Sequence, residues 1–314
     1  MQSVYFGGGT PSYLAEEELA AVFETLSSHF TLADSCEITM EANPEDVTER
    51  WPDHMKKLGV TRISLGVQSL NRNTLNAVRR NHTPEMARQA MEWISDFRDG
   101  WSVDLMLGLP DQNKGNIEQD LLELLSFSPD HLSVYLLERD LPTPLDKFTG
   151  SLPDEDNQAD FFEQVVSKLG EKGYEHYEIS NFCRPGFQSE HNMNYWQFGD
   201  YLGVGPAAHG RLGRTYWKNH PNLSQYMSSV GENATGLCHE ENWSHEQWNR
   251  ERNIQGMRLL RGIPSSWLSP TEIEGLESLG EHGLVSYEKN NWRLTEKGVL
   301  LANEVFLVFL ADRE

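Results

Sequence analysis

The stretch FGGGTP (residues 6–11) directly follows a short run of β-branched and aromatic residues, and it decides how the remaining sequence is interpreted. Val4, Tyr5 and Phe6 favour a strand, which the three glycines and the proline bring to an end. Glycines at such a point let the backbone approach a ligand closely and aim its amides at an anionic group. The spacing matches neither a P-loop nor a GxGxxG fingerprint. An ordinary tight turn between a strand and a helix remains the alternative.

Apolar runs alternate with polar stretches of helical length through the first 140 residues, which predicts a parallel sheet. The expected strands are residues 3–6, 37–41, 62–67, 103–107 and 131–137. Polar or glycine residues stand within or just beyond four of them. In a (β/α) barrel such strand ends converge on one rim where ligands bind, whereas an open sheet uses one or two. We therefore predict a whole or partial barrel.

Beyond Pro142 the character of the sequence changes, and we expect three domains. Residues 1–150 would form the partial barrel, 151–238 an extension and 239–314 a small C-terminal domain. Within the extension, residues 175–236 are rich in Gly, His, Asn and aromatic residues and are expected to be rich in loops. The C-terminal part predicts two helices, a hairpin and a further helix, the pattern of a winged helix. It has no basic recognition face, so we expect a structural role.

Composition excludes several classes of partner. The 314 residues carry a formal net charge of −22, which argues against nucleic acid or anionic lipid, since both are bound through surplus Lys and Arg. No apolar run reaches the length of a membrane-spanning helix. The three cysteines, Cys36, Cys183 and Cys238, are too far apart for a metal or redox motif and indicate a reducing compartment.

Four side chains are candidates for ligand binding near the predicted rim. Asp104 stands inside an apolar run, and a buried carboxylate needs a partner or a function. Glu41, at a strand end in EANP, could accept both hydroxyls of a ribose. Gln68 in GVQS offers an amide, and Arg80 in RRNH could pair with a carboxylate. Taken singly, Glu41, Gln68 and Arg80 fit a capping or surface role equally well.

A second dense stretch, HNMNYWQFGDYLGVGPAAHG (residues 191–210), combines histidines with aromatic residues. It could bind a flat aromatic cofactor by stacking and imidazole ligation, with His191 and His209 as candidate ligands. The alternative is a packed loop that closes one end of the barrel. Arg211, Arg214 and Lys218 then form a local basic island suited to carboxylates such as porphyrin propionates. A simple hairpin explains this island equally well.

The sequence resembles the oxygen-independent coproporphyrinogen III oxidase-like family of radical SAM proteins. The resemblance rests on six motifs that occur in the family's order and close to the family's spacings: FGGGTP, EANPE, ISLGVQSL, RRNH, DLMLGLPDQ and HNMNYW. The last motif is similar to the branch of HemW-type heme chaperones, its animal mitochondrial members above all. The resemblance implies an α/β fold, an incomplete (β/α)6 radical SAM barrel missing its first strand. A small C-terminal winged-helix-like α+β module would follow.

The resemblance also implies a site for S-adenosylmethionine (SAM) at the barrel mouth. Gly8, Gly9 and Thr10 would meet the methionyl end, and the four rim side chains would complete the pocket: Glu41, Gln68, Arg80 and Asp104. In the family a CxxxCxxC segment precedes the residues that match FGGGTP, and its three thiolates hold a [4Fe–4S] cluster. The cysteines of this chain do not match those positions. We expect a shortened chain rather than a degenerate member, with a cluster only where a preceding segment supplies the cysteines.

The function implied is that of a heme-binding chaperone that delivers heme to acceptor proteins. Two alternatives stay open: an oxygen-independent coproporphyrinogen III oxidase in its full-length form, and a pseudoenzyme that binds SAM. Whether this chain is itself an enzyme is left undecided. The expected location is the mitochondrion in a eukaryote and otherwise the cytoplasm.

Overall fold

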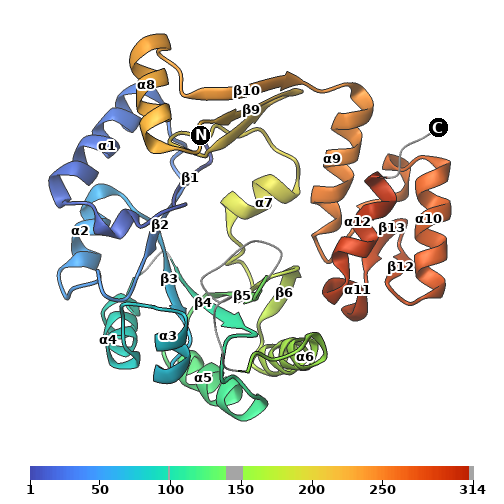
Figure 1. Cartoon of the computed structure of the whole chain (residues 1–314), viewed down its shortest axis with the longest axis horizontal. Coiled ribbons are helices and arrows are strands. Elements are labelled where there is room, and N and C mark those ends of the chain that lie inside the picture. Colours follow the sequence, from blue (N-terminus) through green and yellow to red (C-terminus); the bar gives the residue numbers. More distant parts are fainter. Residues whose placement is uncertain (98–99, 139–150, 311–314) are drawn as a thin grey trace. The chain divides into compact units, whose positions relative to one another are not determined.

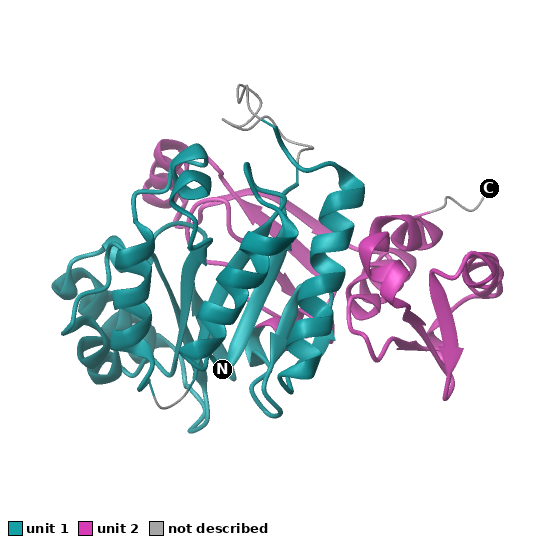
Figure 2. Ribbon diagram, turned by 90° about the horizontal axis from the view of Figure 1, so that it is seen from below, with its two compact units in different colours: residues 1–191 teal, residues 192–314 magenta. Residues whose placement is uncertain are grey.

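The computed structural model describes residues 1–97, 100–138 and 151–310, and the chain forms two compact units (Figures 1 and 2). Unit 1 comprises Met1–His191 and unit 2 comprises Asn192–Glu314. The three predicted domains remain a prediction. Their first boundary, after residue 150, borders a segment outside the described residues.

Unit 1 is built on one seven-stranded sheet with the strand order β1-β2-β3-β4-β5-β7-β6. The first five strands run parallel, and β7 and β6 pair antiparallel at the far edge. The strands are β1 Ser3–Phe6, β2 Glu37–Ala42, β3 Arg62–Gln68, β4 Trp101–Leu107, β5 His131–Leu136, β6 Glu175–Glu178 and β7 Asn181–Cys183. All five predicted strands are present, with ends that differ by at most two residues.

Helices follow the strands and cover the outer face of the curved sheet (Figure 1). They are η1 Pro11–Tyr13, α1 Glu16–His29, α2 Trp51–Leu58, α3 Arg72–Ala77, α4 Pro84–Ile94, α5 Lys114–Ser126 and α6 Glu155–Glu171. The short helix α7 Glu190–Trp196 follows β7 and continues from unit 1 into unit 2. The predicted incomplete α/β barrel is thereby confirmed.

The two faces of the sheet differ in polarity. Residues in register on neighbouring strands share a face, and one such row joins Glu41, Ser64, Ser102 and His131. The residues that alternate with this row are apolar and fully buried, among them Ile63, Leu65, Val103 and Leu105. The apolar face packs beneath the helices, so the polar row faces the concave side of the sheet.

Unit 2 contains two small antiparallel sheets, each with its own helices. The first has the order β10-β9-β8 and the second β11-β13-β12. The elements are β8 His209–Leu212, β9 Thr215–Asn219, α8 Leu223–Asn233, β10 Leu237–Asn242, α9 His245–Met257, β11 Ile263–Pro264, η3 Ser265–Trp267, α10 Pro270–Glu281, β12 Val285–Glu288, β13 Asn291–Leu294, α11 Glu296–Leu300 and α12 Ala302–Leu310. The predicted winged-helix pattern is present, except that its last helix is divided near Leu301.

Residues 175–236 were expected to be rich in loops, and between their loops they also contain four strands and two helices. The four strands have only three to five residues each. Sequence windows that short show no clear period, so pairing with neighbours decides their conformation. Across the described ranges, no helix has both the length and the apolar character needed to cross a bilayer.

The start of α4 shows how local sequence sets an element's bounds. The Thr83 hydroxyl accepts a hydrogen bond from the Met86 amide at 3.3 Å, and Pro84 occupies the first turn, where a missing amide hydrogen costs nothing.

Replacing this cap tests its contribution to stability. Thr83→Ala leaves an amide of the first turn without its acceptor and is expected to lower the free energy of unfolding by about 1 kcal/mol. Thermal unfolding followed by circular dichroism measures the loss. Thr83→Ser keeps the acceptor and should unfold within about 0.5 kcal/mol of the wild type.

Candidate functional site

A polar cleft of about 210 Å³ lies in unit 1, at the carboxyl ends of its parallel strands. It is lined by Gly9, Thr10, Pro11, Ser12, Glu41, Ala42, Asn43, Ser64, Gly66, Gln68, Arg80 and Asp104. Six of the seven residues predicted to bind SAM are therefore brought together. The seventh, Gly8, adjoins the cleft and donates its amide hydrogen to the Glu41 carboxylate at 3.3 Å.

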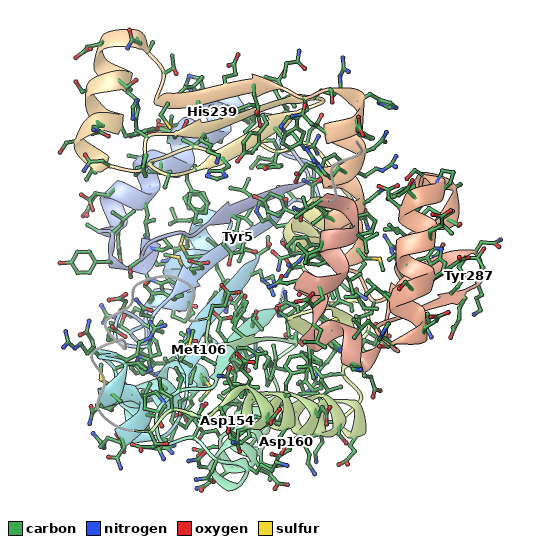
Figure 3. The ribbon with its side chains drawn as sticks, turned by 45° about the vertical axis from the view of Figure 1, so that its right-hand side comes forward. Tyr5, Met106, Asp154, Asp160, His239 and Tyr287 are labelled. Atoms are coloured by element: carbon green, nitrogen blue, oxygen red, sulfur yellow. The ribbon has the colours of Figure 1, made fainter. Side chains whose placement is uncertain are left out.

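Glu41 ties the glycine turn after β1 to the neighbouring strand. Its Oε1 accepts from the Tyr5 hydroxyl at 2.7 Å and its Oε2 from Gly8 (Tyr5 is labelled in Figure 3). Burial and the Glu41 charge raise the pKa of Tyr5, which stays a hydrogen-bond donor. A Cβ at Gly7 would stand 2.6 Å from Tyr5 Cε1 and 2.7 Å from the Glu41 carboxyl carbon, so a side chain here would displace the Tyr5–Glu41 contact. In contrast, the space beside Gly8 and Gly9 is open within 4 Å.

Asn43, a polar residue just past a strand end, links Arg80 to the glycine turn, although it was not among the residues predicted to bind the ligand. Its Oδ1 accepts from the Arg80 guanidinium at 3.3 Å, and its Nδ2 donates to the Thr10 hydroxyl at 3.5 Å. Ser12, Ser64 and Gly66 also line the cleft without having been predicted. These residues lie inside or beside the quoted motifs, and that position was the sequence signal that could have identified them.

Gln68 is held in an unusual conformation at the end of β3. Its φ of 65° lies in the left-handed region, where a residue with a side chain is strained. The side chain is buried, and its Oε1 has no hydrogen-bond partner among the described residues. A Cβ at Gly66 would approach its Nε2 to 3.2 Å. The cleft thus presents a preformed acceptor that a ligand's donor would satisfy.

Asp104 is the second carboxylate of the cleft. Burial, together with the nearby Glu41 charge, raises its pKa from 3.8 to about 6, although hydrogen bonds from Ser133 and Ser64 oppose the shift. The Ser64 hydroxyl donates to its Oδ1 at 3.2 Å. A positively charged ligand would stabilise the ionised form. Two carboxylates and an unpartnered amide oxygen therefore suit a cationic ligand.

The described residues do not fit an iron–sulfur cluster. No group of three His, Cys, Asp or Glu side chains among them lies close enough to hold a metal ion. Cys36 and Cys183 are buried in unit 1, whereas Cys238 is exposed in unit 2.

The two histidines proposed as heme ligands lie in different units. His191, in unit 1, stacks on the Tyr5 ring at 4.9 Å between centroids, and its Nδ1 lies 3.0 Å from the Ser3 hydroxyl. His209 begins β8 in unit 2 and lines a cavity of about 470 Å³. The 191–210 stretch supplies much of this cavity's aromatic wall. Residues of β10 and α9 complete it, and their distance along the chain concealed them from the sequence analysis.

The predicted basic island is wrong for Arg211. Its side chain is only 2% exposed, and its guanidinium donates to the carbonyls of Phe198 at 2.8 Å and Gly213 at 2.7 Å. It also pairs with Asp200 at 3.1 Å. Arg211 therefore anchors the loop before β8 and has no free face for a propionate, while Arg214 and Lys218 are exposed.

The raised pKa of Asp104 predicts a pH-dependent cost to the fold. The folded protein binds this proton more tightly than the unfolded chain, so stability is lost as the pH rises from about 4 through about 6. Asp104→Asn keeps an acceptor for Ser64 and cannot ionise. We expect it to raise the free energy of unfolding by on the order of 2 kcal/mol at about pH 8. Unfolding measured across pH should show this gain vanish below about pH 4; a gain independent of pH would contradict the assignment.

A conservative substitution tests the anchoring role of Arg211. Arg211→Lys keeps the charge but loses the planar fork that reaches several carbonyls, and it should destabilise unit 2 by about 2 kcal/mol. Arg214→Lys, at an exposed position, is the matched control and should be neutral in thermal unfolding. Equal stability of the two variants would refute the role.

Comparisons with known proteins agree with the radical SAM type of fold. The Radical SAM superfamily model matches residues 1–124. A protein named heme chaperone HemW from Mycobacterium tuberculosis (strain CDC 1551 / Oshkosh) is 34% identical over 320 residues, covering 99% of this chain and 81% of the relative. The bovine mitochondrial radical S-adenosyl methionine domain-containing protein 1 is 34% identical over 317 residues, covering 96% of this chain and 66% of that protein.

Among solved structures, coproporphyrinogen III oxidase (HemN) from Escherichia coli superposes with a TM-score of 0.86. The match covers 98% of this chain and 77% of that structure at 24% identity, so it establishes the fold alone. The 34% identity over nearly the whole chain to a HemW protein establishes the family as well as the fold. The chain belongs to the HemW family of radical SAM proteins.

Proposed function

We propose that this protein binds heme and passes it to acceptor proteins, on a scaffold that holds SAM in the cleft of unit 1. The observation that carries the proposal is the similarity, over 99% of the chain, to relatives named heme chaperone HemW. The oxidase alternative is less well supported, because the likeness to that enzyme has 24% identity and concerns the fold. We place the protein in the mitochondrion of a eukaryotic cell, as the bovine relative's name says of that protein, and otherwise in the cytoplasm.

The cleft suits SAM in charge and in shape. Gly8, Gly9 and Thr10 would receive the methionyl end, since no Cβ fills the space beside the two glycines. Glu41 and Asp104 would favour the sulfonium and ammonium charges. In proteins of this superfamily SAM supplies a 5′-deoxyadenosyl radical when a reduced cluster cleaves it. The described residues do not group thiolates for a cluster, so we propose SAM binding in the cleft and no step through a cluster.

Gln68 would complete the SAM site through its unpartnered Oε1, and Arg80 would do so from its place beside Asn43. The amide oxygen is buried and has no partner, so a hydrogen bond from the ligand to this oxygen would stabilise the complex more than a hydrogen bond to a group that water already solvates. The pocket is therefore assembled before the ligand arrives, which reduces the ordering cost of binding.

Hemin titration of the full chain tests the heme-binding function. We expect saturable binding, seen as a growing Soret band with a defined end point. Hemin-loaded protein mixed with an apo-globin should then lose its heme to that acceptor. Absorbance that grows without saturation would contradict the proposal.

Isothermal titration calorimetry with SAM tests the cleft. Gln68→Ala removes the unpartnered acceptor and is expected to weaken SAM binding by about tenfold, equivalent to about 1.4 kcal/mol. Gln89→Ala, an exposed glutamine on α4, serves as the control and should bind as the wild type does. S-adenosylhomocysteine lacks the sulfonium charge and should bind more weakly than SAM. If Gln68→Ala and Asp104→Asn both leave the affinity unchanged, the cleft is not the SAM site.

A further inference from the structure

The end of β3 forms a strained turn that carries Gln68 into the cleft of unit 1. The Ser69 amide donates to the Val67 carbonyl at 2.8 Å, and Gln68 between them has a φ of 65°. A three-residue turn with a positive central φ is the rare and strained form of the γ-turn. The pairing of β3 with β4 also shifts in register between Leu65 and Gln68, an irregularity that redirects side chains. Since the Gln68 Oε1 has no partner among the described residues, the backbone of this turn decides where that oxygen points.

Asp120, on α5, holds the residues that follow the turn. Its Oδ2 accepts from the Ser69 hydroxyl at 2.7 Å and from the Leu70 amide at 2.9 Å. Both Asp120 and Ser69 are buried. Burial raises the pKa of Asp120 although the two hydrogen bonds oppose the shift, so the folded protein loses stability as the pH rises through the titration of this carboxyl group. A buried carboxylate that costs stability at this place indicates a role in the site.

His82 holds the residue that precedes the turn. Its Nε2 lies 3.0 Å from the Val67 carbonyl oxygen, and because a carbonyl only accepts, Nε2 carries a hydrogen and donates. His82 is buried as well, and its Nδ1 lies 3.4 Å from the Glu45 carboxylate. The Val67 carbonyl therefore accepts from the Ser69 amide within the turn and from His82 outside it.

Neither Asp120 nor His82 lines the cleft, so each can act on it only through the backbone beside Gln68. A strained conformation persists where the surrounding structure fixes it by several contacts. Here a buried side chain fixes a backbone group before the strained residue, and a second one fixes a backbone group after it.

We infer that Asp120 and His82 are positioning residues for SAM, which keep the turn in its strained form and so aim the Gln68 Oε1 at the ligand. The inference rests on the proposed function, because it names the groups that prepare the SAM cleft. Its physical basis is that an acceptor held in place before binding lowers the ordering cost of the complex.

Calorimetric titration of the full chain with SAM tests this role through a double-mutant cycle. Asp120→Ala should weaken SAM binding by about tenfold in the wild-type background, because the turn relaxes and Gln68 leaves its position. In the Gln68→Ala background the same substitution should change the affinity by less than about twofold, since the side chain that Asp120 positions is already absent. A merely structural role would give the same loss in both backgrounds.

Conservative variants should rescue the affinity. Asp120→Asn keeps an acceptor oxygen for Ser69 and Leu70 and should bind SAM within about threefold of the wild type. His82→Leu removes the donor to Val67 and should weaken binding by about fivefold, whereas His82→Gln keeps an N–H donor and should bind more tightly than His82→Leu.

Thr74→Val is the matched control for a loss of stability. Thr74 is buried on α3, and its hydroxyl donates to the Pro110 carbonyl at 3.0 Å. The substitution removes a buried hydrogen bond near the turn without touching the Val67 or Leu70 backbone. It should lower the unfolding temperature, as Asp120→Ala does, and bind SAM as the wild type does.

The outcomes distinguish the two proposals. If the wild type does not bind SAM, the proposed function of the cleft fails. If Gln68→Ala weakens binding but Asp120→Ala and His82→Leu do not, or do so equally in both backgrounds, the SAM site stands and the positioning role is wrong. A loss of affinity in Thr74→Val equal to that in Asp120→Ala also overturns the role. If Asp120→Ala does not fold, Ser69→Ala, which removes only the hydroxyl donor, replaces it in the cycle with the same expected dependence on Gln68.

Discussion

The parallel register of β1 to β5 is the constraint on which the rest of unit 1 depends. Parallel strands bring all their carboxyl ends to one rim, so residues 94 positions apart, from Thr10 to Asp104, line a single cleft. The Glu41 carboxylate stabilises this rim by joining the Tyr5 hydroxyl and the Gly8 amide. A shift of one residue in the pairing of β1 with β2 would turn Glu41 toward the helices and separate the turn from the cleft.

The concave face of the sheet is polar where a closed barrel is usually filled with branched apolar side chains. Ser102 contacts His131 at 2.8 Å, and His131 in turn contacts the Tyr177 hydroxyl at 2.8 Å. Burial lowers the pKa of His131 well below its ordinary value, so it is a neutral link in this network. Ser102, His131 and Tyr177 therefore form a hydrogen-bonded polar network on the inner face of the sheet.

The sequence predicted unit 1 better than unit 2, for a physical reason. Strands such as Arg62–Gln68 are buried along their whole length, so a short stretch of sequence is enough to recognise them by their apolar residues. The SAM candidates stand in motifs beside these strands, and topology alone brings them together. In unit 2 the cavity joins residues 195–216 with residues 241–255, and nothing local indicates that pairing. Arg211 looked like a surface cation because sequence does not show that carbonyl groups surround it.

The elevated pKa of Asp104 couples the cleft to the acidity of the solvent. At pH values near 6 a fraction of molecules carries a proton on this carboxyl group. A ligand that brings positive charge would shift the carboxyl toward its ionised form, and the proton would leave as the ligand enters. Ligand uptake would then become an exchange of one cation for another. Its affinity would rise with pH even for a ligand whose own charge stays constant, so acidification of the surroundings would weaken binding without any change in the fold.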